Sequence, residues 1–134
     1  MKYYTRLKLY KSPNLTLDIE NGIAYSYDWY EIAKRVNDQW YVNEYSYSNS
    51  TIKHVIKIKS QLMKLGFNFE TIEAPSGLQK LDQAKSFYID KIENLNTLIN
   101  KKGTRKDKNI ERMNEISKLQ FKINLVETLI NENV

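Results

Sequence analysis

The chain of 134 residues contains no cysteine, a single histidine, two prolines and four glycines. Without cysteine it forms no disulfide bond and offers no thiolate to a metal ion or a reaction, which fits a reducing compartment. Four glycines give little material for a phosphate-binding loop, and the sequence has no nucleophile-elbow motif and no metal-ligand spacing. We therefore expect no cofactor, no metal site and no catalytic residues.

Long apolar runs are also missing. No segment approaches the ~20 apolar residues that cross a bilayer, and the N-terminal MKYYTRLKLYKSPN lacks the apolar core of a signal peptide. The hydrophobic share of 41% and the charged share of 28% are ordinary for a folded protein in water. We expect a soluble cytoplasmic protein that does not bind a membrane.

Negative charge is scarce in two stretches of a chain whose formal net charge is +5. Residues 45–69 contain no carboxylate, and their lysines form one candidate basic patch, with Lys57 and Lys64 joined by Lys53 and Lys59. Local patches favour a specific acidic partner over a uniformly basic coat. The second stretch, the basic loop, carries five cations against the single carboxylate of Asp107: Lys101, Lys102, Arg105, Lys106 and Lys108.

The first half of the chain is typical of β-strands. TRLKLY and LTLDI alternate apolar and polar residues with the period of a half-buried strand, and Asn21-Gly22 predicts a hairpin because both residues accept a positive φ. With the aromatic segments IAYSYDWYEIAKRV and WYVNEYSYS, they predict an antiparallel meander of about four strands. A short helix at EIAKRV is the alternative. The two aromatic strands would each gather rings on one face, Tyr25, Tyr27 and Trp29 on the first and Tyr41, Tyr45 and Tyr47 on the second.

A helix is predicted at STIKHVIKIKSQLMKLG, with Ser50 or Asn49 as the N-cap and Gly66 as the C-terminal stop. Its apolar residues recur at three- and four-residue steps, which predicts a face that packs on the sheet. FNFETIEA then predicts a further strand. The apolar face is formed by Val55, Ile58, Leu62 and Leu65, with Ile52, Ile56 and Met63 beside them.

The last part of the chain predicts two helices in an antiparallel hairpin around a glycine loop. Ser76 to Gln79 matches a capping box, and two apolar series run at heptad-like steps on either side of Gly103. Leu98 and Leu129 widen these stripes, so the surplus must be covered by the sheet or by a second copy. We expect a homodimer through these helices, with the seams formed by Leu81, Ala84, Tyr88, Ile92, Leu95 and Ile99, and by Ile110, Met113, Ile116, Leu119, Ile123, Val126 and Ile130.

The expected fold class is therefore α+β, a small antiparallel sheet with one packed helix, followed by a C-terminal antiparallel αα-hairpin. The sheet and its helix would occupy residues 1–75, and the hairpin residues 76–134. The hairpin would pack on this core or on a second protomer.

The segment YSYSNSTIKH, residues 45–54, precedes and opens the predicted helix. A helix N-terminus attracts anions, so a candidate anion site for a phosphate, a nucleotide or a carboxylate consists of Ser48, Ser50, Thr51, Lys53 and His54. The alternative interpretation is a plain helix cap with His54 solvated. General acid–base catalysis is disfavoured because the chain has no second histidine and no cysteine.

The basic loop suits nucleic-acid phosphates or an acidic protein groove, although such loops are usually just solvated. The tyrosines suit base stacking, a protein-binding surface or simply the core of a small sheet. These alternatives stay open on the sequence alone.

The segment from Ala24 to Gly66, with its Tyr- and Trp-rich hairpin and its Tyr-Ser-x-Ser/Thr-x-x-Lys-His helix start, resembles a loose class of small phage-encoded accessory proteins. The resemblance implies expression in the cytoplasm of an infected bacterium and a non-enzymatic protein that binds and inhibits a host factor, as anti-defence and anti-CRISPR proteins do. The partner would be a host protein or a nucleoprotein complex. Two alternatives remain. One is a nucleic-acid-binding module, and the other is a protein that uses Ser48 to His54 to bind a nucleotide or phosphate or to act as a small hydrolase.

Overall fold

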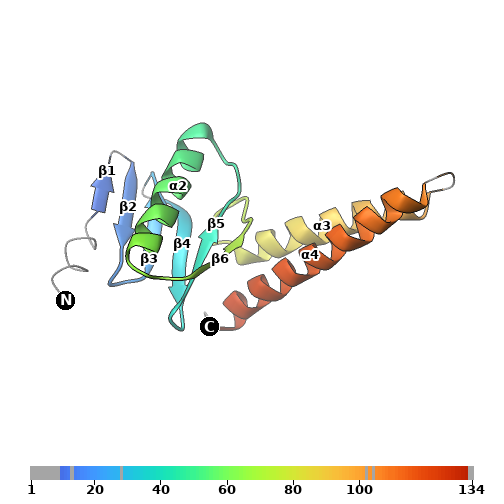
Figure 1. The fold of residues 1–134 in the computed structure, drawn as a ribbon. Helices are drawn as coiled ribbons and strands as arrows, with labels where there is room; N and C mark the ends of the chain where they lie inside the picture. The colour runs from blue at the N-terminus through green and yellow to red at the C-terminus, as the bar shows by residue number, and fades with distance from the viewer. Residues whose placement is uncertain (1–9, 13, 28, 102, 104, 133–134) are drawn as a thin grey trace.

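The computed structural model describes residues 10–12, 14–27, 29–101, 103 and 105–132. A twisted sheet carries one helix on a face, and a long helical hairpin projects away from it (Figure 1). The α+β class and the C-terminal αα-hairpin are confirmed. The elements are β1 (Tyr10–Ser12), β2 (Leu15–Asp18), β3 (Ile23–Ser26), β4 (Tyr30–Val36), β5 (Gln39–Asn43), α2 (Asn49–Lys64), β6 (Phe69–Ile72), α3 (Leu81–Ile99) and α4 (Lys106–Glu132).

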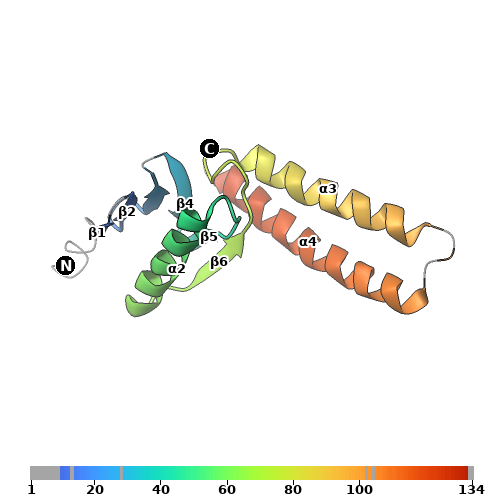
Figure 2. The same ribbon diagram turned by 90° about the horizontal axis from the view of Figure 1, so that it is seen from above.

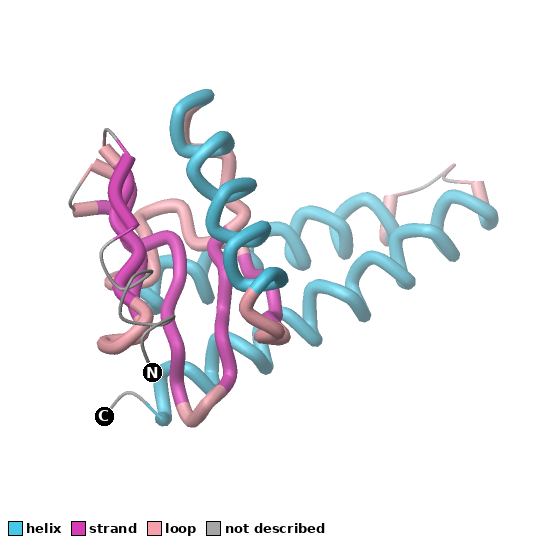
Figure 3. Tube along the Cα trace, turned by 60° about the vertical axis from the view of Figure 1, so that its left-hand side comes forward, coloured by secondary structure: helices cyan, strands magenta, loops and turns pink. Residues whose placement is uncertain are grey.

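Six strands of the described residues form one sheet in the order β1-β2-β3-β4-β5-β6. Neighbours from β1 to β5 are antiparallel, as predicted, but the segment IAYSYDWYEIAKRV forms two strands, β3 and β4, that pair with each other, so this part of the sheet has five strands where about four were predicted. Strand β6 pairs with β5 in parallel. The strand β6 was predicted, but the expectation of a purely antiparallel sheet is wrong, because β6 makes the sheet mixed. Helix α2 carries the chain back to the starting end of β5, as a parallel connection requires (Figure 3). Of the predicted strand TRLKLY only Tyr10 is described, because residues 1–9 lie outside the described part of the chain.

Two hairpins position the centre of the sheet. The hairpin at Asn21-Gly22 is confirmed, although of these two residues only Gly22 has a positive φ, of 69°. Between β4 and β5, Asn37 and Asp38 have φ values of 50° and 64°, the left-handed pair of a type I′ turn. The alternative helix at EIAKRV is wrong, because these residues belong to β4.

The predicted aromatic faces are wrong at their outer ends. Strand β3 ends at Ser26 and β4 begins at Tyr30, so Tyr27 and Trp29 lie in the connecting turn. Tyr27 has a φ of 58°, an uncommon value for a bulky residue. Tyr45 and Tyr47 likewise follow the end of β5 and lie in the loop that leads to α2.

Helix α2 is capped by Ser48, one residue before the earlier of the two predicted caps. Its Oγ atom accepts a hydrogen bond from the Thr51 amide at 3.1 Å. Gly66, with a φ of 80°, ends the helix as predicted, and its amide donates to the Met63 carbonyl at 3.0 Å. The predicted face of Val55, Ile58 and Leu62 is buried on the sheet. The flanking apolar residues are instead exposed, namely Ile52, Ile56 and Met63.

The sheet separates two hydrophobic cores (Figure 2). Trp40 and Val42 of β5 pack toward α2, whereas Tyr41 between them packs toward the hairpin, as the strand period of two requires. The second core joins residues 41, 72 and 74 to the hairpin, so it draws on both predicted domains. Its hairpin members are Leu78, Leu81, Ala84, Tyr88, Leu119, Ile123, Val126 and Leu129.

The hairpin is packed at its base and exposed along its distal half. The predicted seam is confirmed from Leu81 to Tyr88 and from Leu119 to Val126. Ile110 and Met113 do not belong to it, since they are 52% and 53% exposed. Asn109 and Arg112 occupy the partly buried positions there and bond to each other at 3.2 Å.

The predicted capping box at Ser76 to Gln79 is wrong. Helix α3 begins later, with Lys80 as its N-cap and no side-chain cap bond. The Gln79 side chain reaches the start of β4 instead, where it accepts from the Glu31 amide at 3.1 Å and donates to the carbonyl of Trp29 in the preceding turn at 2.7 Å. Ser76 bonds to the Gln83 side chain.

The hairpin also covers the outer edge of β6. Lys122 of α4 donates to the Thr71 carbonyl at 2.5 Å and to the Thr71 hydroxyl at 3.1 Å. The Glu73 amide donates to the Tyr88 hydroxyl of α3. Side chains of the hairpin therefore satisfy backbone groups that a sheet edge leaves open.

Candidate functional site

The Ser48–His54 segment forms a chain of hydrogen bonds that crosses from α2 to β3. The Ser48 hydroxyl donates to the Thr51 hydroxyl at 3.0 Å. The Ser26 hydroxyl of β3 lies 3.4 Å from the Thr51 hydroxyl and 2.7 Å from Nδ1 of His54. Ser26 and Thr51 are fully buried and His54 is 8% exposed. These contacts fix the first turns of α2 against β3.

The environment of His54 favours its neutral form. Burial lowers the pKa of this imidazole, and the nearby charge of Lys57 lowers the pKa further. The ring of Tyr27 lies 5.6 Å away, centroid to centroid. The interpretation of His54 as a solvated helix residue is therefore wrong, because the side chain is a buried partner of Ser26.

The pair of Ser26 and His54 has the atoms of a nucleophile and a base, but its position restricts what it can do. A nucleophilic serine must reach a substrate, and Ser26 is 0% exposed. The triads that activate serine also orient the imidazole with a third group. Among the described hydrogen bonds of His54 none goes to a carboxylate. The geometry supports a structural link between α2 and β3.

The structure brings together only some of the predicted anion-site residues. Ser48, Thr51 and His54 lie in one network, while Ser50 and Lys53 share no described hydrogen bond with it. Lys53 is exposed and Ser50 is half-buried. The hydroxyls of Ser48 and Thr51 bond to each other, which favours the helix-cap interpretation. Sequence reasoning missed Ser26, and no local signal marks it.

Aromatic side chains gather beside this helix start. The rings of Trp29 and Tyr47 are 5.7 Å apart and nearly perpendicular, and Tyr47 lies 4.7 Å from the buried ring of Tyr30. Trp29 is 51% exposed and Tyr47 is 49% exposed. Exposed tryptophan and tyrosine are typical of protein-binding surfaces and also of base-stacking platforms.

The basic loop lies at the end of the hairpin away from the sheet (Figure 1). Two of its cations are paired with nearby carboxylates, Arg105 with Asp107 at 3.2 Å and Lys108 with Glu111 at 3.8 Å. Lys102 lies outside the described residues. The described cations of the loop are all exposed, namely Lys101, Arg105, Lys106 and Lys108.

The second basic patch lies on α2, where Lys57 and Lys64 are exposed together with Lys53. Lys59, which the sequence grouped with them, is only half-exposed and pairs with Glu44. Because α2 covers the sheet and the basic loop ends the hairpin, the two patches do not form one surface (Figure 1).

Within the described ranges, no group of three or more His, Cys, Asp or Glu residues is placed to hold a metal ion. None of the helices in that part of the chain is long and apolar enough to cross a membrane. No family model, no curated protein and no solved structure matches the chain.

Proposed function

We propose that the chain is a non-enzymatic phage accessory protein that binds and inhibits a host factor in the cytoplasm of the infected bacterium, in the manner of anti-defence or anti-CRISPR proteins. The sheet with α2 serves as the scaffold, and the α3–α4 hairpin presents the contact. The phage origin and the cytoplasmic location rest on the resemblance of the segment from Ala24 to Gly66.

The observation that carries this proposal is the hairpin itself. It extends beyond the part that packs on the sheet, and its free end carries the exposed cations of the basic loop (Figure 1). Leu98 of α3 is 41% exposed close to these cations in the sequence. A projecting element with an apolar residue and several cations suits a groove that is acidic at its rim.

The buried hydroxyl–imidazole network supports the non-enzymatic part of the proposal. The only imidazole of the chain is 8% exposed and is engaged by Ser26. An acid–base catalyst needs to approach the proton that it transfers. A protein with this arrangement acts through its surfaces.

The experiment that tests the proposal reverses charge at the tip. The immobilised variant Lys101→Glu/Lys106→Glu should capture at least about tenfold less of the host protein than the wild type does, because the reversed charges repel an acidic surface. The matched control Lys80→Glu/Lys118→Glu reverses two exposed lysines away from the basic loop and should capture the wild-type amount. Circular dichroism checks that both variants fold.

Two results would contradict the proposal. Equal capture by the tip variant and the wild type would remove the basic loop from the contact. Turnover of a nucleotide or a phosphodiester by the purified chain, lost in His54→Ala, would show an enzyme.

A further inference from the structure

Helix α2 exposes an apolar stripe. Ile52, Ile56 and Met63 are 39%, 61% and 67% exposed, although the helix buries its other apolar side chains. They recur at steps of four and seven residues, so they lie on one side of the helix. The stripe is about 16 Å long, since an α-helix rises 1.5 Å per residue. An exposed apolar row of this kind indicates a surface that another molecule covers.

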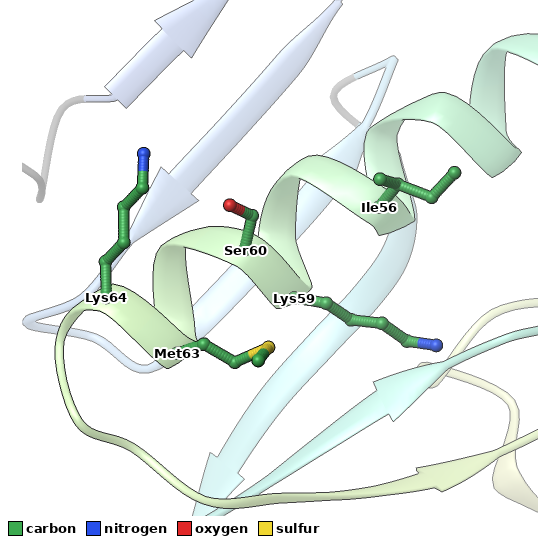
Figure 4. Close-up of a pocket in the computed structure, with 5 residues that line it drawn as sticks. All are labelled: Ile56, Lys59, Ser60, Met63 and Lys64. Atoms are coloured by element: carbon green, nitrogen blue, oxygen red, sulfur yellow. The ribbon is translucent and has the colours of Figure 1, made fainter.

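A ridge of lysines runs parallel to the stripe. Lys53, Lys57 and Lys64 are exposed, and each directly follows one residue of the stripe in the sequence. Consecutive residues are about 100° apart around a helix, so the ridge borders the stripe on its side away from the sheet. Figure 4 shows Ile56 and Met63 on one side of α2, with Lys64 leaving from the neighbouring side.

The stripe lines a shallow groove, called here the α2 groove. One part of it is formed by Ile56, Lys59, Ser60, Met63 and Lys64. The adjoining part shares Ile56 and Lys59 and is completed by the loop that follows β5. Its further residues are Glu44, Tyr45, Ser46, Ile52 and Val55. The groove therefore follows the whole length of the stripe.

The charge around the α2 groove is positive. Glu44, the carboxylate that lines it, is paired with Lys59, and in this pair the lysine holds the pKa of Glu44 below its ordinary value although burial acts in the opposite direction. In the described part of the chain, Lys53, Lys57 and Lys64 form no ion pair of their own. A ligand with carboxylates along one flank would neutralise this ridge.

We propose that the α2 groove binds an acidic amphipathic helix of a partner protein. Apolar residues at i, i+3, i+4 and i+7 of that helix would cover Ile52, Ile56 and Met63 over about three turns. Its aspartates and glutamates would face Lys53, Lys57 and Lys64. This surface is distinct from the basic loop, so it adds a second contact to the proposed function.

Other occupants fit the groove less well. A second copy that docked through the same helix would place lysine ridge against lysine ridge. A nucleic acid would find aliphatic side chains in the stripe, which offer no face for base stacking. A flat bilayer would bury only three apolar side chains of this stripe, with the carboxylate of Glu44 beside them, which is little apolar area for membrane binding.

The test uses the full chain and two labelled helical peptides of about four turns, or ~15 residues. The acidic peptide carries leucines on one face and glutamates on both flanks, and its twin carries lysines in place of the glutamates. Fluorescence anisotropy should show that the acidic peptide binds. The twin should bind with an affinity at least about tenfold lower, which corresponds to ~1.4 kcal/mol of binding free energy.

Variants locate the binding on α2. Ile56→Ser/Met63→Ser and, separately, Lys53→Glu/Lys57→Glu/Lys64→Glu should each weaken binding of the acidic peptide at least about tenfold. The matched control Ile110→Ser/Met113→Ser changes an isoleucine and a methionine on α4 that are also more than half exposed, and it should leave binding unchanged. The tip variant Lys101→Glu/Lys106→Glu should also bind the peptide normally, even where it loses the host partner.

Several results would overturn the inference. These are no binding of the acidic peptide, equal binding of both peptides, or equal loss in the α4 control. Binding of duplex DNA or of phosphatidylserine vesicles that requires Ile56 and Met63 would assign the groove to another class of ligand.

Discussion

Nδ1 of His54 in α2 lies 2.7 Å from Oγ of Ser26 in β3, and both side chains are buried. Of the long helices, α2 is the one that covers this face of the sheet, and its first turns are held there by polar contacts. Its later turns are held by Val55, Ile58 and Leu62. The hydrogen bond therefore joins a helix to a strand that is 28 residues earlier in the sequence.

The stability of the protein should depend on pH through His54. Burial lowers the pKa of the folded imidazole below 6.5, so the unfolded chain binds the proton more readily. The stabilisation is complete above pH 6.5 and is lost as the pH falls from there through the lowered value. Urea unfolding at pH 7.5 and 5.5 should show a smaller pH dependence in His54→Gln than in the wild type. Parallel profiles of the two proteins would contradict the assignment.

Asn43 should be a major determinant of stability. Its side chain donates to the Ala74 carbonyl at 2.9 Å and accepts from the amides of Ala74 and Tyr45 at 2.9 and 3.0 Å. Asn43 itself is fully buried. Asn43→Ala should lower the free energy of unfolding by about 2–4 kcal/mol, because it leaves buried polar groups unpaired. The control Asn96→Ala, at an exposed helix position, should change it by less than about 0.5 kcal/mol. Equal effects in chemical denaturation would refute this role.

Nucleic acid should bind weakly at physiological salt. The exposed aromatic pair of Trp29 and Tyr47 lies in the loops beside the start of α2. The basic loop is instead at the far end of the hairpin, and two of its cations are paired with carboxylates. We expect labelled single- and double-stranded DNA and RNA to bind no tighter than ~10⁻⁴ M, the weak end of non-specific binding. A micromolar affinity that falls steeply with salt and is lost in Lys101→Glu/Lys106→Glu would favour the nucleic-acid-binding module.

The purified chain should form a homodimer through α4. Ile110, Met113 and Phe121 are 52%, 53% and 53% exposed, and their spacing places them opposite the buried side of this helix. Light scattering should give twice the 15.9 kDa chain mass for the wild type, and the chain mass for Met113→Ser/Phe121→Ser. The control variant Ile56→Ser/Met63→Ser, which carries the matched change on α2, should remain a dimer. A monomeric wild type at high concentration would mean that this face of α4 is not a dimer contact.

Local patterns in the sequence predicted the elements that depend on near neighbours. The run from Val55 to Leu62 and the stop at Gly66 follow from helical spacing and from a residue that accepts a positive φ. The antiparallel pairing of β2 with β3 and of β4 with β5 follows from alternation and short turns, whereas the turn between β3 and β4 was not predicted. The two-helix hairpin follows from its matched apolar series, which are confirmed where they pack on the sheet.

Errors arose where a distant residue decides the outcome. Gln79 matches a capping box, but its side chain bonds to two backbone groups about 50 residues earlier, the Glu31 amide of β4 and the Trp29 carbonyl of the turn before it. His54 has the sequence context of a solvated helix residue, and Ser26 gives it a buried partner. In the distal hairpin, Asn109 and Arg112 form the partly buried seam where Ile110 and Met113 were expected. Spacing alone does not identify a partner far along the chain.

Lys122 donates to Thr71 of β6, and Tyr88 accepts from the amide of Glu73 directly after β6, which has a consequence for how the hairpin can be shortened. Deleting α3 and α4 entirely would leave β6 with bare amides and carbonyls, which the same strand of another molecule can join to start a self-templating stack. Such a truncation would precipitate for reasons unrelated to any host partner. Removing the same number of turns from the distal ends of both helices would instead delete the basic loop while leaving β6 covered. Such a variant would lose the proposed contact and keep the fold.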